Sequence, residues 1–357
     1  MHRIRINMND KIKLAQGAGG ELMDKLIKEN ILKHFNFQSN AEISLDMLDD
    51  SAVIDDIVFS TDSHTVKPII FPGGDLGSLA VAGTVNDISV MGAKPIALSA
   101  GFIIEEGLPL DIFKKIVKSM GDTAKKADVP IITGDTKVVE NGAIQEFMIN
   151  TSGIGKRTNL LNKNIQIVKK YRSFESRWLQ DSNIREGDKI ILSGNIGEHG
   201  VALMSFREGY GFETKIKSDV APITSLVEKS LKVGGVVSAK DPTRGGLANT
   251  VNELSEKSKQ GIMLFEEKIP IPKGVSSACD MLGIDPLEIG NEGKVVFAVV
   301  KEKADEVLSE IRKDPLGKNA EIIGEVAKKL RGVVIQTTIG GRRNLHKPIG
   351  DPVPRIC

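Results

Sequence analysis

Cysteine is scarce in this chain: only Cys279 and Cys357 occur among 357 residues, and they lie far apart. Two cysteines in this arrangement cannot supply the usual cysteine-rich zinc site, and they give no disulfide framework. We interpret Cys279, which lies within a predicted helix, as a small buried apolar residue. Cys357 is different because it is the last residue of the sequence.

An excess of either charge is also missing, with 48 Lys and Arg residues against 47 Asp and Glu residues. This balance argues against a nucleic-acid partner, which favours a basic surface. No run approaches the roughly 18 apolar residues of a membrane span, and the first residues lack the apolar segment of a secretory signal. The sequence therefore predicts a cytoplasmic protein with no nucleic-acid partner and no membrane contact.

The length predicts two domains, each large enough to bury its own core. Apolar periodicity predicts an α/β fold with mixed (α+β) sheets in both. The predicted parts are an N-terminal domain at 1–155, a polar linker or insertion at 156–186, a C-terminal domain at 187–339 and a tail at 340–357. Helices are predicted at 20–35, 76–91, 109–127, 199–207, 223–233, 247–257, 275–282 and 304–311. Strands are predicted at 52–54, 57–59, 95–104, 129–139, 144–154, 189–193, 262–265, 294–300, 321–326 and 332–338.

The tail ends in a segment that favours neither helix nor strand, because 348–357 contains three prolines and one glycine. Proline fixes φ and lacks an N–H, so we expect this segment to be extended and mobile. A thiol on such an arm suits a tethered reactive group. The α-carboxylate of Cys357 disfavours its thiolate, so a partner or an internal pocket must activate the thiol. The alternative is a terminal cysteine with no function.

Acidic residues recur beside glycines and at strand ends in the first domain. Carboxylates from several elements of one domain suit a hard cation such as Mg²⁺, which also binds phosphate oxygens and water. Each acid alone is equally typical of an ordinary turn. The set comprises Asp49, Asp50, Asp62, Asp75, Asp87 (after Asn86) and Asp135 (before Thr136).

Two glycine-rich segments precede predicted helices. In the first, Gly17, Gly19 and Gly20 allow main-chain N–H groups to approach an anion at a helix N-terminus. It matches neither the Walker nor the dinucleotide-binding pattern. In the second, 241–246, we interpret Asp241 and Thr243 first as a helix cap and second as ligands.

Three side chains are candidate bases. Lys137 follows Asp135 on an apolar strand, where it is either a solvated charge or a base with a shifted pKa. His64 has the same ambiguity, since most lone histidines only satisfy a hydrogen bond. Glu292 lies just before a predicted strand, at a sheet edge where ligands tend to bind.

Together these motifs resemble the HypE family of hydrogenase maturation proteins, within the superfamily of aminoimidazole ribonucleotide synthetase (PurM). The resemblance covers nearly the whole chain. The ending 354–357 separates it from selenophosphate synthetase, thiamine-monophosphate kinase and PurM itself. Two departures are Gln16, where such chains often have histidine, and an apparent insertion at 163–182. The motifs lie at 17–20, 48–53, 61–64, 71–75, 83–93, 134–138, 241–248, 291–294 and 354–357.

The resemblance implies a two-domain PurM-like fold whose N-terminal sheets pair across a homodimer, with ATP near that interface. It implies that the carbamoyltransferase HypF places a carboxamide on the sulfur of Cys357. The chain then dehydrates this group to an S-cyanate with ATP, and cyanide passes to iron on the HypC–HypD scaffold for [NiFe]-hydrogenase assembly.

The resemblance also implies roles for the candidate residues. Cys357 carries the reacting group, and Lys137, Glu292 or His64 removes protons. The expected Mg²⁺ ligands are Asp49, Asp50, Asp62, Asp87 and Asp135. The expected nucleotide-binding residues are Gly17, Gly19, Gly20, Asp75, Asn86, Thr136, Asp241 and Thr243.

Two alternatives remain open from the sequence. Another ATP-dependent enzyme of the superfamily is one, although a selenophosphate synthetase keeps its reactive residue in the glycine loop, which here has no cysteine. A non-catalytic adaptor with a docking tail is the other. ATP turnover that depends on a modified Cys357 would separate the adaptor from the dehydratase.

Overall fold

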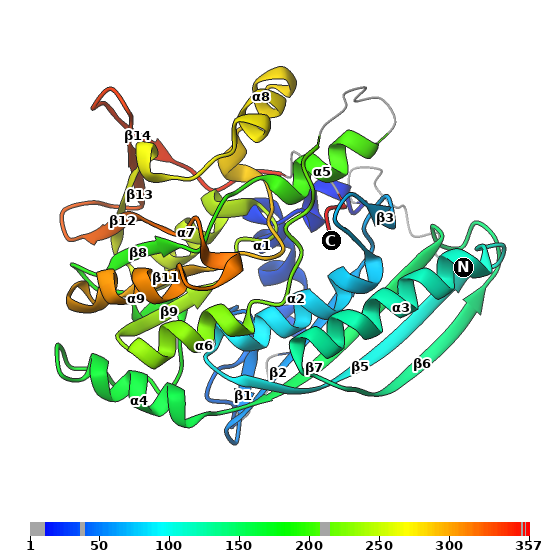
Figure 1. Ribbon diagram of the computed structural model, residues 1–357, viewed down its shortest axis with the longest axis horizontal. Helices are drawn as coiled ribbons and strands as arrows, with labels where there is room; N and C mark the ends of the chain where they lie inside the picture. The colour runs from blue at the N-terminus through cyan, green and yellow to red at the C-terminus, as the bar shows by residue number, and fades with distance from the viewer. Residues whose placement is uncertain (1–10, 36–39, 208–214, 351–352, 354) are drawn as a thin grey trace, which may run out of the picture.

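Two mixed β-sheets organise the chain in the computed structural model, which describes residues 11–35, 40–207, 215–350, 353 and 355–357. The sheets belong to the two halves of the sequence, and helices pack on both (Figure 1). The predicted two-domain α/β fold with mixed sheets is confirmed.

The first sheet has the strand order β1-β2-β7-β5-β6, with β5 and β6 parallel and the other neighbours antiparallel. Helices α2 and α3 run along one of its faces (Figure 1). A short β3–β4 hairpin precedes α2. The elements of this half are α1 (Gly20–Asn30), β1 (Ala52–Ile54), β2 (Ile57–His64), β3 (Ile70–Phe71), β4 (Gly74–Asp75), α2 (Leu76–Val90), β5 (Lys94–Glu105), α3 (Leu110–Ala127), β6 (Ile131–Val139) and β7 (Phe147–Lys156).

The second sheet has the order β14-β13-β10-β12-β8-β11-β9, in which only β10 and β13 run parallel. Strands β9 and β14 were not predicted, and β14 lies within the segment assigned to the tail. The elements are α4 (Asn159–Val168), β8 (Lys189–Leu192), α5 (Glu198–Phe206), α6 (Thr224–Val233), β9 (Val236–Lys240), α7 (Gly246–Ser258), β10 (Gly261–Phe265), α8 (Lys273–Leu282), β11 (Val296–Val299), α9 (Ala304–Ile311), β12 (Glu321–Ala327), β13 (Val333–Gln336) and β14 (Arg342–Leu345).

Helix α2 is the structural centre of the first domain, because glycines let its neighbours approach closely. A Cβ at Gly77 would lie 2.2 Å from the carbonyl oxygen of Ile116 in α3. A Cβ at Gly155 of β7 would lie 2.3 Å from Cγ2 of Ile88. The helix begins with a capping box, in which the side chain of Asp75 accepts a hydrogen bond from the N–H of Ser78 at 2.9 Å. Asp75 was predicted to bind nucleotide, but here it fixes the start of α2.

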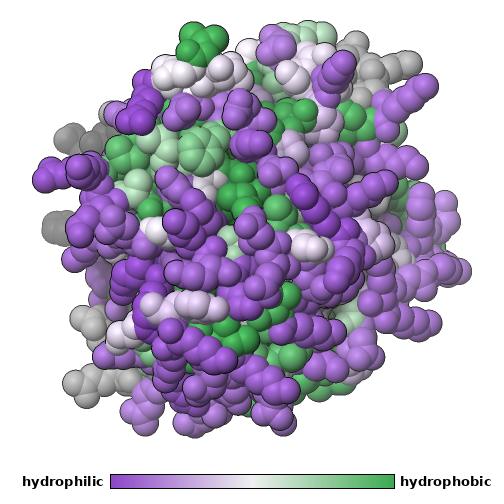
Figure 2. Space-filling view, turned by 60° about the vertical axis from the view of Figure 1, so that its left-hand side comes forward, coloured by the Kyte–Doolittle hydropathy of each residue, from purple (hydrophilic) through white to green (hydrophobic). Residues whose placement is uncertain are grey.

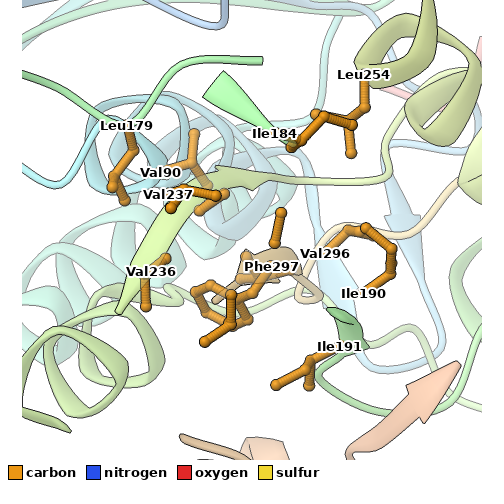
Figure 3. Close-up of a cluster of buried hydrophobic side chains, with 14 of the residues drawn as sticks. Val90, Leu179, Ile184, Ile190, Ile191, Val236, Val237, Leu254, Val296 and Phe297 are labelled. Atoms are coloured by element: carbon orange, nitrogen blue, oxygen red, sulfur yellow. The ribbon is translucent and has the colours of Figure 1, made fainter. Parts of the chain in front are cut away.

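The segment 156–186, interpreted from the sequence as a polar linker or insertion, is a packed part of the molecule. It contains helix α4, and the side chain of Trp178 is only 1% exposed. Leu179 and Ile184 pack with Val90 of the first domain and Val237 of the second in one apolar cluster (Figure 3). This segment therefore joins the two domains through a shared core.

The surface is mainly polar. On the face seen in Figure 2, hydrophilic residues predominate and hydrophobic residues form separate patches. Of the helices among the described residues, none has the length and apolar character needed to cross a membrane. The C-terminus lies inside the molecule, near α5 and β3 (Figure 1).

Candidate active site

A cavity of about 470 Å³ lies between the two domains. The first domain contributes one side of α1, the loop before β1, strand β2 and helix α2. The second contributes the end of β9, the loop that follows it, helix α7 and the loop before β11. Eleven of the predicted site residues line this cavity together: Gly19, Gly20, Asp49, Asp50, Asp62, His64, Asp87, Asp241, Thr243, Glu292 and Cys357.

The chain end enters this cavity from the side of the first domain. Cys357 is half-buried, and Ile356 is only 2% exposed. One terminal oxygen of Cys357 accepts a hydrogen bond from the N–H of Thr65 at 3.1 Å. The sequence predicted a thiol on an extended, mobile arm. In this structure Cys357 instead lines an internal pocket.

Four carboxylates concentrate negative charge in the cavity. Burial raises the pKa of Asp87 well above its ordinary value, and Asp62, Asp241 and Asp50 raise it further. The pKa of Asp241 is raised to about 6, mainly by burial. The charge of Lys240 lowers this pKa, and the charge of Asp62 raises it. The Oγ of Ser60 donates a hydrogen bond to Asp87 at 2.7 Å. Such mutual repulsion makes the cluster a favourable place for a cation.

Lys240 is a functional residue that the sequence analysis missed. Its Nζ lies 2.5 Å from Oδ1 of Asp50, 3.2 Å from Oδ2 of Asp181 and 3.3 Å from Oε2 of Glu253. Burial opposes its charge, but these three carboxylates together raise its pKa well above the ordinary value. The sequence feature that could have revealed it is a lysine at the end of an apolar run, directly before Asp241.

Lys257 extends this network from helix α7. Its Nζ contacts Asp49 at 3.0 Å and Asp181 at 2.6 Å. Asp49 is thus engaged by a lysine of the other domain. The two lysines hold the loop that carries Asp49 and Asp50 against the second domain.

Arg244, which lies inside the quoted 241–248 motif, was also missed. It is half-buried and lines the cavity beside Cys357. The negative charge of Cys357 is the largest influence that raises its pKa, and Asp62, Glu292 and Asp87 act in the same direction. Asp241 and Thr243 do not cap α7, since the residue before the helix is Gly245. Their side chains are therefore available to the cavity, contrary to the first interpretation.

Glu292 and His64 are the two candidate bases in the cavity. Burial raises the pKa of Glu292 well above its ordinary value, and Asp241 and Asp219 raise it further. Among the described residues, no group forms a hydrogen bond with its Oε1. Burial lowers the pKa of His64, so its ring is neutral. The ring packs against Gly83, where a Cβ would lie 2.8 Å from Cε1 of His64.

Asp135, Thr136 and Lys137 lie away from this cavity. They are on β6, the edge strand of the first sheet, and the side chains of Asp135 and Lys137 are 73% and 70% exposed. Their charged atoms are 3.6 Å apart. Within one chain they do not reach Cys357, because the motif lies in the middle of an edge strand, so their roles at the site stay predictions.

Asn86 and Gly17, which were predicted to bind nucleotide, do not line this cavity. The side-chain amide of Asn86 donates to the carbonyls of Ala221 and Glu292 and accepts from the N–H of Ile223, which ties α2 to the second domain. Gly17 lines a second cavity of about 380 Å³, on the other side of Cys357.

The residues present fit a magnesium ion by their chemistry, since Asp50, Asp62, Asp87 and Asp241 offer only oxygen ligands. In the described part of the chain, no three His, Cys, Asp or Glu side chains already form a metal-binding group. Mg²⁺ takes one or two carboxylates and completes its coordination with water and phosphate oxygens, so the four aspartates need not all contact one ion.

The fold and this cavity define an AIR synthase related protein. The models of its N-terminal and C-terminal domains match residues 48–156 and 185–336. The chain is 54% identical over 353 residues to a putative hydrogenase expression/formation protein of Methanocaldococcus jannaschii, covering 97% of this chain and 100% of the relative. It is 41% identical over 355 residues to the carbamoyl dehydratase HypE of Azotobacter vinelandii, covering 98% of each.

Two solved structures are also similar. A HypE–HypF complex contains a chain with a TM-score of 0.81 and 44% identity, covering 90% of this chain and 99% of that one. HypE in complex with ATP has a TM-score of 0.77 and 40% identity, covering 97% and 100%. The chain therefore belongs to the HypE family of carbamoyl dehydratases, which act in hydrogenase maturation.

Proposed function

We propose that this chain dehydrates an S-carboxamide on its own Cys357 to an S-cyanate, with ATP as the co-substrate. One observation carries the proposal: Cys357 lines an acidic cavity together with Glu292 and Arg244. A group attached to the sulfur is thereby delivered to a base and a cation of the same chain. A related HypE has been solved with ATP, which supports the co-substrate.

The reaction balances as the loss of one water. The carbon–oxygen bond of the carboxamide breaks, both protons leave nitrogen, and a carbon–nitrogen triple bond forms. ATP supplies the phosphoryl group that converts the departing oxygen into phosphate, a far better leaving group than oxide. The products are the S-cyanate, ADP and phosphate.

The side chains divide this work. We assign proton removal to Glu292, because a raised pKa makes its carboxylate a stronger base at the site. His64 is the second candidate, as a neutral imidazole 3.8 Å from Asp62. Arg244 balances the negative charge that develops next to Cys357. Asp50, Asp62 and Asp87 would hold Mg²⁺, with Asp49 behind them, and the ion would neutralise phosphate charge.

The partners follow from the chemistry of the group. HypF loads the carboxamide on Cys357, which is supported by a solved HypE–HypF complex. The HypC–HypD complex receives cyanide, and we place the reaction in the cytoplasm, where ATP is available. Both exchanges require the chain end to leave the cavity, so the docked tail is one of two states.

We also propose that the chain forms a homodimer through the first sheet. Opposite α2 and α3, outward positions carry apolar side chains, among them Phe59 and Ile103, which are 46% and 39% exposed, and their cross-strand partners Ile154 and Met148 on β7. An apolar sheet face of this kind favours pairing with another surface. The edge strand β6 would then bring Asp135, Thr136 and Lys137 to the partner's site, where their predicted roles still stand.

The experiment that tests this function is intact-mass spectrometry after incubation with HypF and its carbamoyl donor. The carboxamide adduct should lose the mass of one water only when ATP is added, and neither species should form on Cys357→Ala. An adduct that never loses water with ATP would contradict the proposal. The adaptor alternative predicts that result, since a docking tail needs no chemistry.

A further inference from the structure

The docked segment, residues 355–357, is held by its main chain on the side of the first domain. The N–H of Thr65 donates to the oxygen of Cys357 at 3.1 Å, and the N–H of Lys67 donates to the carbonyl of Arg355 at 3.4 Å. This alternation is typical of an antiparallel pair. The carbonyl of Ile356, between these two positions, is bound by the second domain instead.

His199 of α5 is the residue that binds this carbonyl. Its Nε2 lies 2.9 Å from the oxygen of Ile356, and its side chain is fully buried. A carbonyl only accepts a hydrogen bond, so Nε2 carries the proton. Burial is the largest influence on the pKa of His199 and lowers it. The ring is therefore neutral, and Nδ1 is left as an acceptor.

Ser218 fixes the orientation of this ring. Its Oγ lies 2.7 Å from Nδ1 of His199 and donates to it, because Nδ1 has no proton. The same Oγ accepts from the N–H of Val220 at 3.1 Å, and the N–H of Ser218 donates to the carbonyl of Pro72 at 2.7 Å. Phe71 packs edge-on against the imidazole, with ring centroids 5.4 Å apart. Both domains thus hold the ring in place.

The loop that carries Glu292 belongs to the same framework. The side chain of Asn291 accepts a hydrogen bond at 2.7 Å from the N–H of Gly197, directly before α5. A Cβ at Gly290 would lie 2.9 Å from Cδ1 of Ile356, so this loop also packs against the docked segment. One loop therefore carries the proposed base, supports the helix that binds the carbonyl and contacts the docked segment.

We propose that His199, oriented by Ser218, is a positioning residue that binds the main-chain carbonyl of Ile356 and so holds the Cys357 thiol in the active-site cavity. Its ligand is the peptide backbone one residue before the reacting cysteine. The effect on the rate of dehydration rests on the proposed function, whereas the docking does not. Without this hydrogen bond the first domain alone would pair with the segment, and the sulfur would be less well placed.

The first test uses full-length chains without nucleotide and two substitutions that separate the two ring nitrogens. His199→Gln places an amide N–H near the position of Nε2, so it can still donate to the docked carbonyl. His199→Asn has a shorter side chain whose amide lies near Nδ1, so it loses the carbonyl. His34→Asn, at an exposed histidine, is the matched control. The readout is the alkylation rate of Cys357, with buried Cys279 as the internal reference for unfolding.

His199→Asn should raise the alkylation rate of Cys357 about tenfold relative to Cys279, because a buried hydrogen bond that holds the segment is lost. His199→Gln should stay within about twofold of the unaltered chain, and His34→Asn should not differ from it. No increase in His199→Asn, or an equal increase in both His199 variants, would overturn the proposal.

Two further measurements keep the proposal falsifiable if His199→Asn does not fold. Ser218→Ala should raise the alkylation rate about threefold, because the ring loses its orienting partner, and an unchanged rate would contradict the proposal. Nitrogen-15 NMR of the unaltered chain shows which ring nitrogen carries the proton, and the sequence has only five histidines. The proposal predicts a proton on Nε2 of His199. A proton on Nδ1 instead would overturn it, since two acceptors would then face each other.

The consequence for the reaction is measured on the chain loaded with its carboxamide. His199→Asn should lower the single-turnover dehydration rate about tenfold at saturating Mg-ATP, with the ATP concentration for half-maximal rate unchanged. The reason is that the thiol is displaced and the nucleotide is not. An unchanged rate with a raised half-maximal ATP concentration would mean that His199 acts on the nucleotide, and would overturn the positioning role.

Failure of this inference is distinct from failure of the proposed function. Unchanged alkylation in His199→Asn would overturn the positioning role, even if the unaltered chain dehydrates its carboxamide. If the unaltered chain fails to dehydrate with ATP, the proposed function falls, while the alkylation rates and the ring tautomer, both measured without nucleotide, still support the docking contact.

Discussion

Lys240, at the end of β9, reaches across the domain boundary to Asp50, with 2.5 Å between Nζ and Oδ1. Asp181 of the joining segment and Glu253 of α7 surround the same ammonium group. One buried cation thus neutralises carboxylates from three parts of the chain. The relationship makes the cavity stable before any ligand binds.

Replacement of Lys240 by methionine should be strongly destabilising. It leaves buried carboxylates without their cation, which costs about 3–5 kcal/mol of unfolding free energy. Adding Asp50→Asn to the same chain should recover part of the loss, because one uncompensated charge is removed. Urea unfolding measures both. Lys137→Met is the matched control, since that lysine is 70% exposed and its loss should change stability by no more than about 0.5 kcal/mol.

Glu292→Gln should lower the dehydration rate about a hundredfold or more, because the proposed base is lost while the side-chain volume is kept. The base must be ionised, and its pKa is raised well above the ordinary value of 4.5. The rate of the unaltered chain should therefore keep rising with pH beyond the range in which an ordinary glutamate titrates. Glu288→Gln, outside the cavity lining, is the control. A full rate in Glu292→Gln would return the role to His64 or Lys137.

Asp241→Asn should change how stability depends on pH. The unfolded carboxyl titrates near 3.8 and the folded one near 6, so between these values only the folded state keeps the proton. The free energy of unfolding of the unaltered chain therefore falls as pH rises through this window. Above it, Asp241→Asn should be the more stable chain by up to about 3 kcal/mol in the absence of Mg²⁺. Equal stability at all pH values would contradict this account of the charge cluster.

Ile103→Glu should convert the proposed dimer to a monomer, because it places a charge on the exposed apolar face of the first sheet. Sedimentation measures the mass, and an unchanged unfolding temperature would show that the chain itself is intact. Ile339→Glu is the control, since Ile339 is 93% exposed at the turn before β14. An Ile103→Glu chain that remains dimeric would exclude this face as the interface.

The sequence predicted those parts of the site that short motifs carry. Asp62, Asp87 and Cys357 were singled out from neighbouring glycines or from the chain end, and the structure brings them to one cavity. Lys240 and Arg244 were missed because their importance depends on partners from the other domain. A lysine after an apolar run has no special meaning until Asp50 and Asp181 surround it.

The errors have a related cause. Lys137 was predicted at the site from its motif, and within one chain it lies elsewhere, because the position of β6 at a sheet edge depends on pairing with β5, which the motif does not encode. The segment 156–186 is polar in sequence, yet Trp178 and Leu179 are buried against residues far along the chain. Local patterns predicted the elements well, whereas contacts between the domains required the structure.

The central claim is that the carboxamide oxygen on Cys357 leaves as phosphate, and oxygen-18 tests it most directly. The carboxamide is formed with labelled oxygen, the modified chain is mixed with Mg-ATP, and the released phosphate is analysed by mass spectrometry. The account predicts one labelled oxygen in phosphate for each S-cyanate formed. S-cyanate with the label in water and unlabelled phosphate would contradict it, because the oxygen would then leave without phosphoryl transfer.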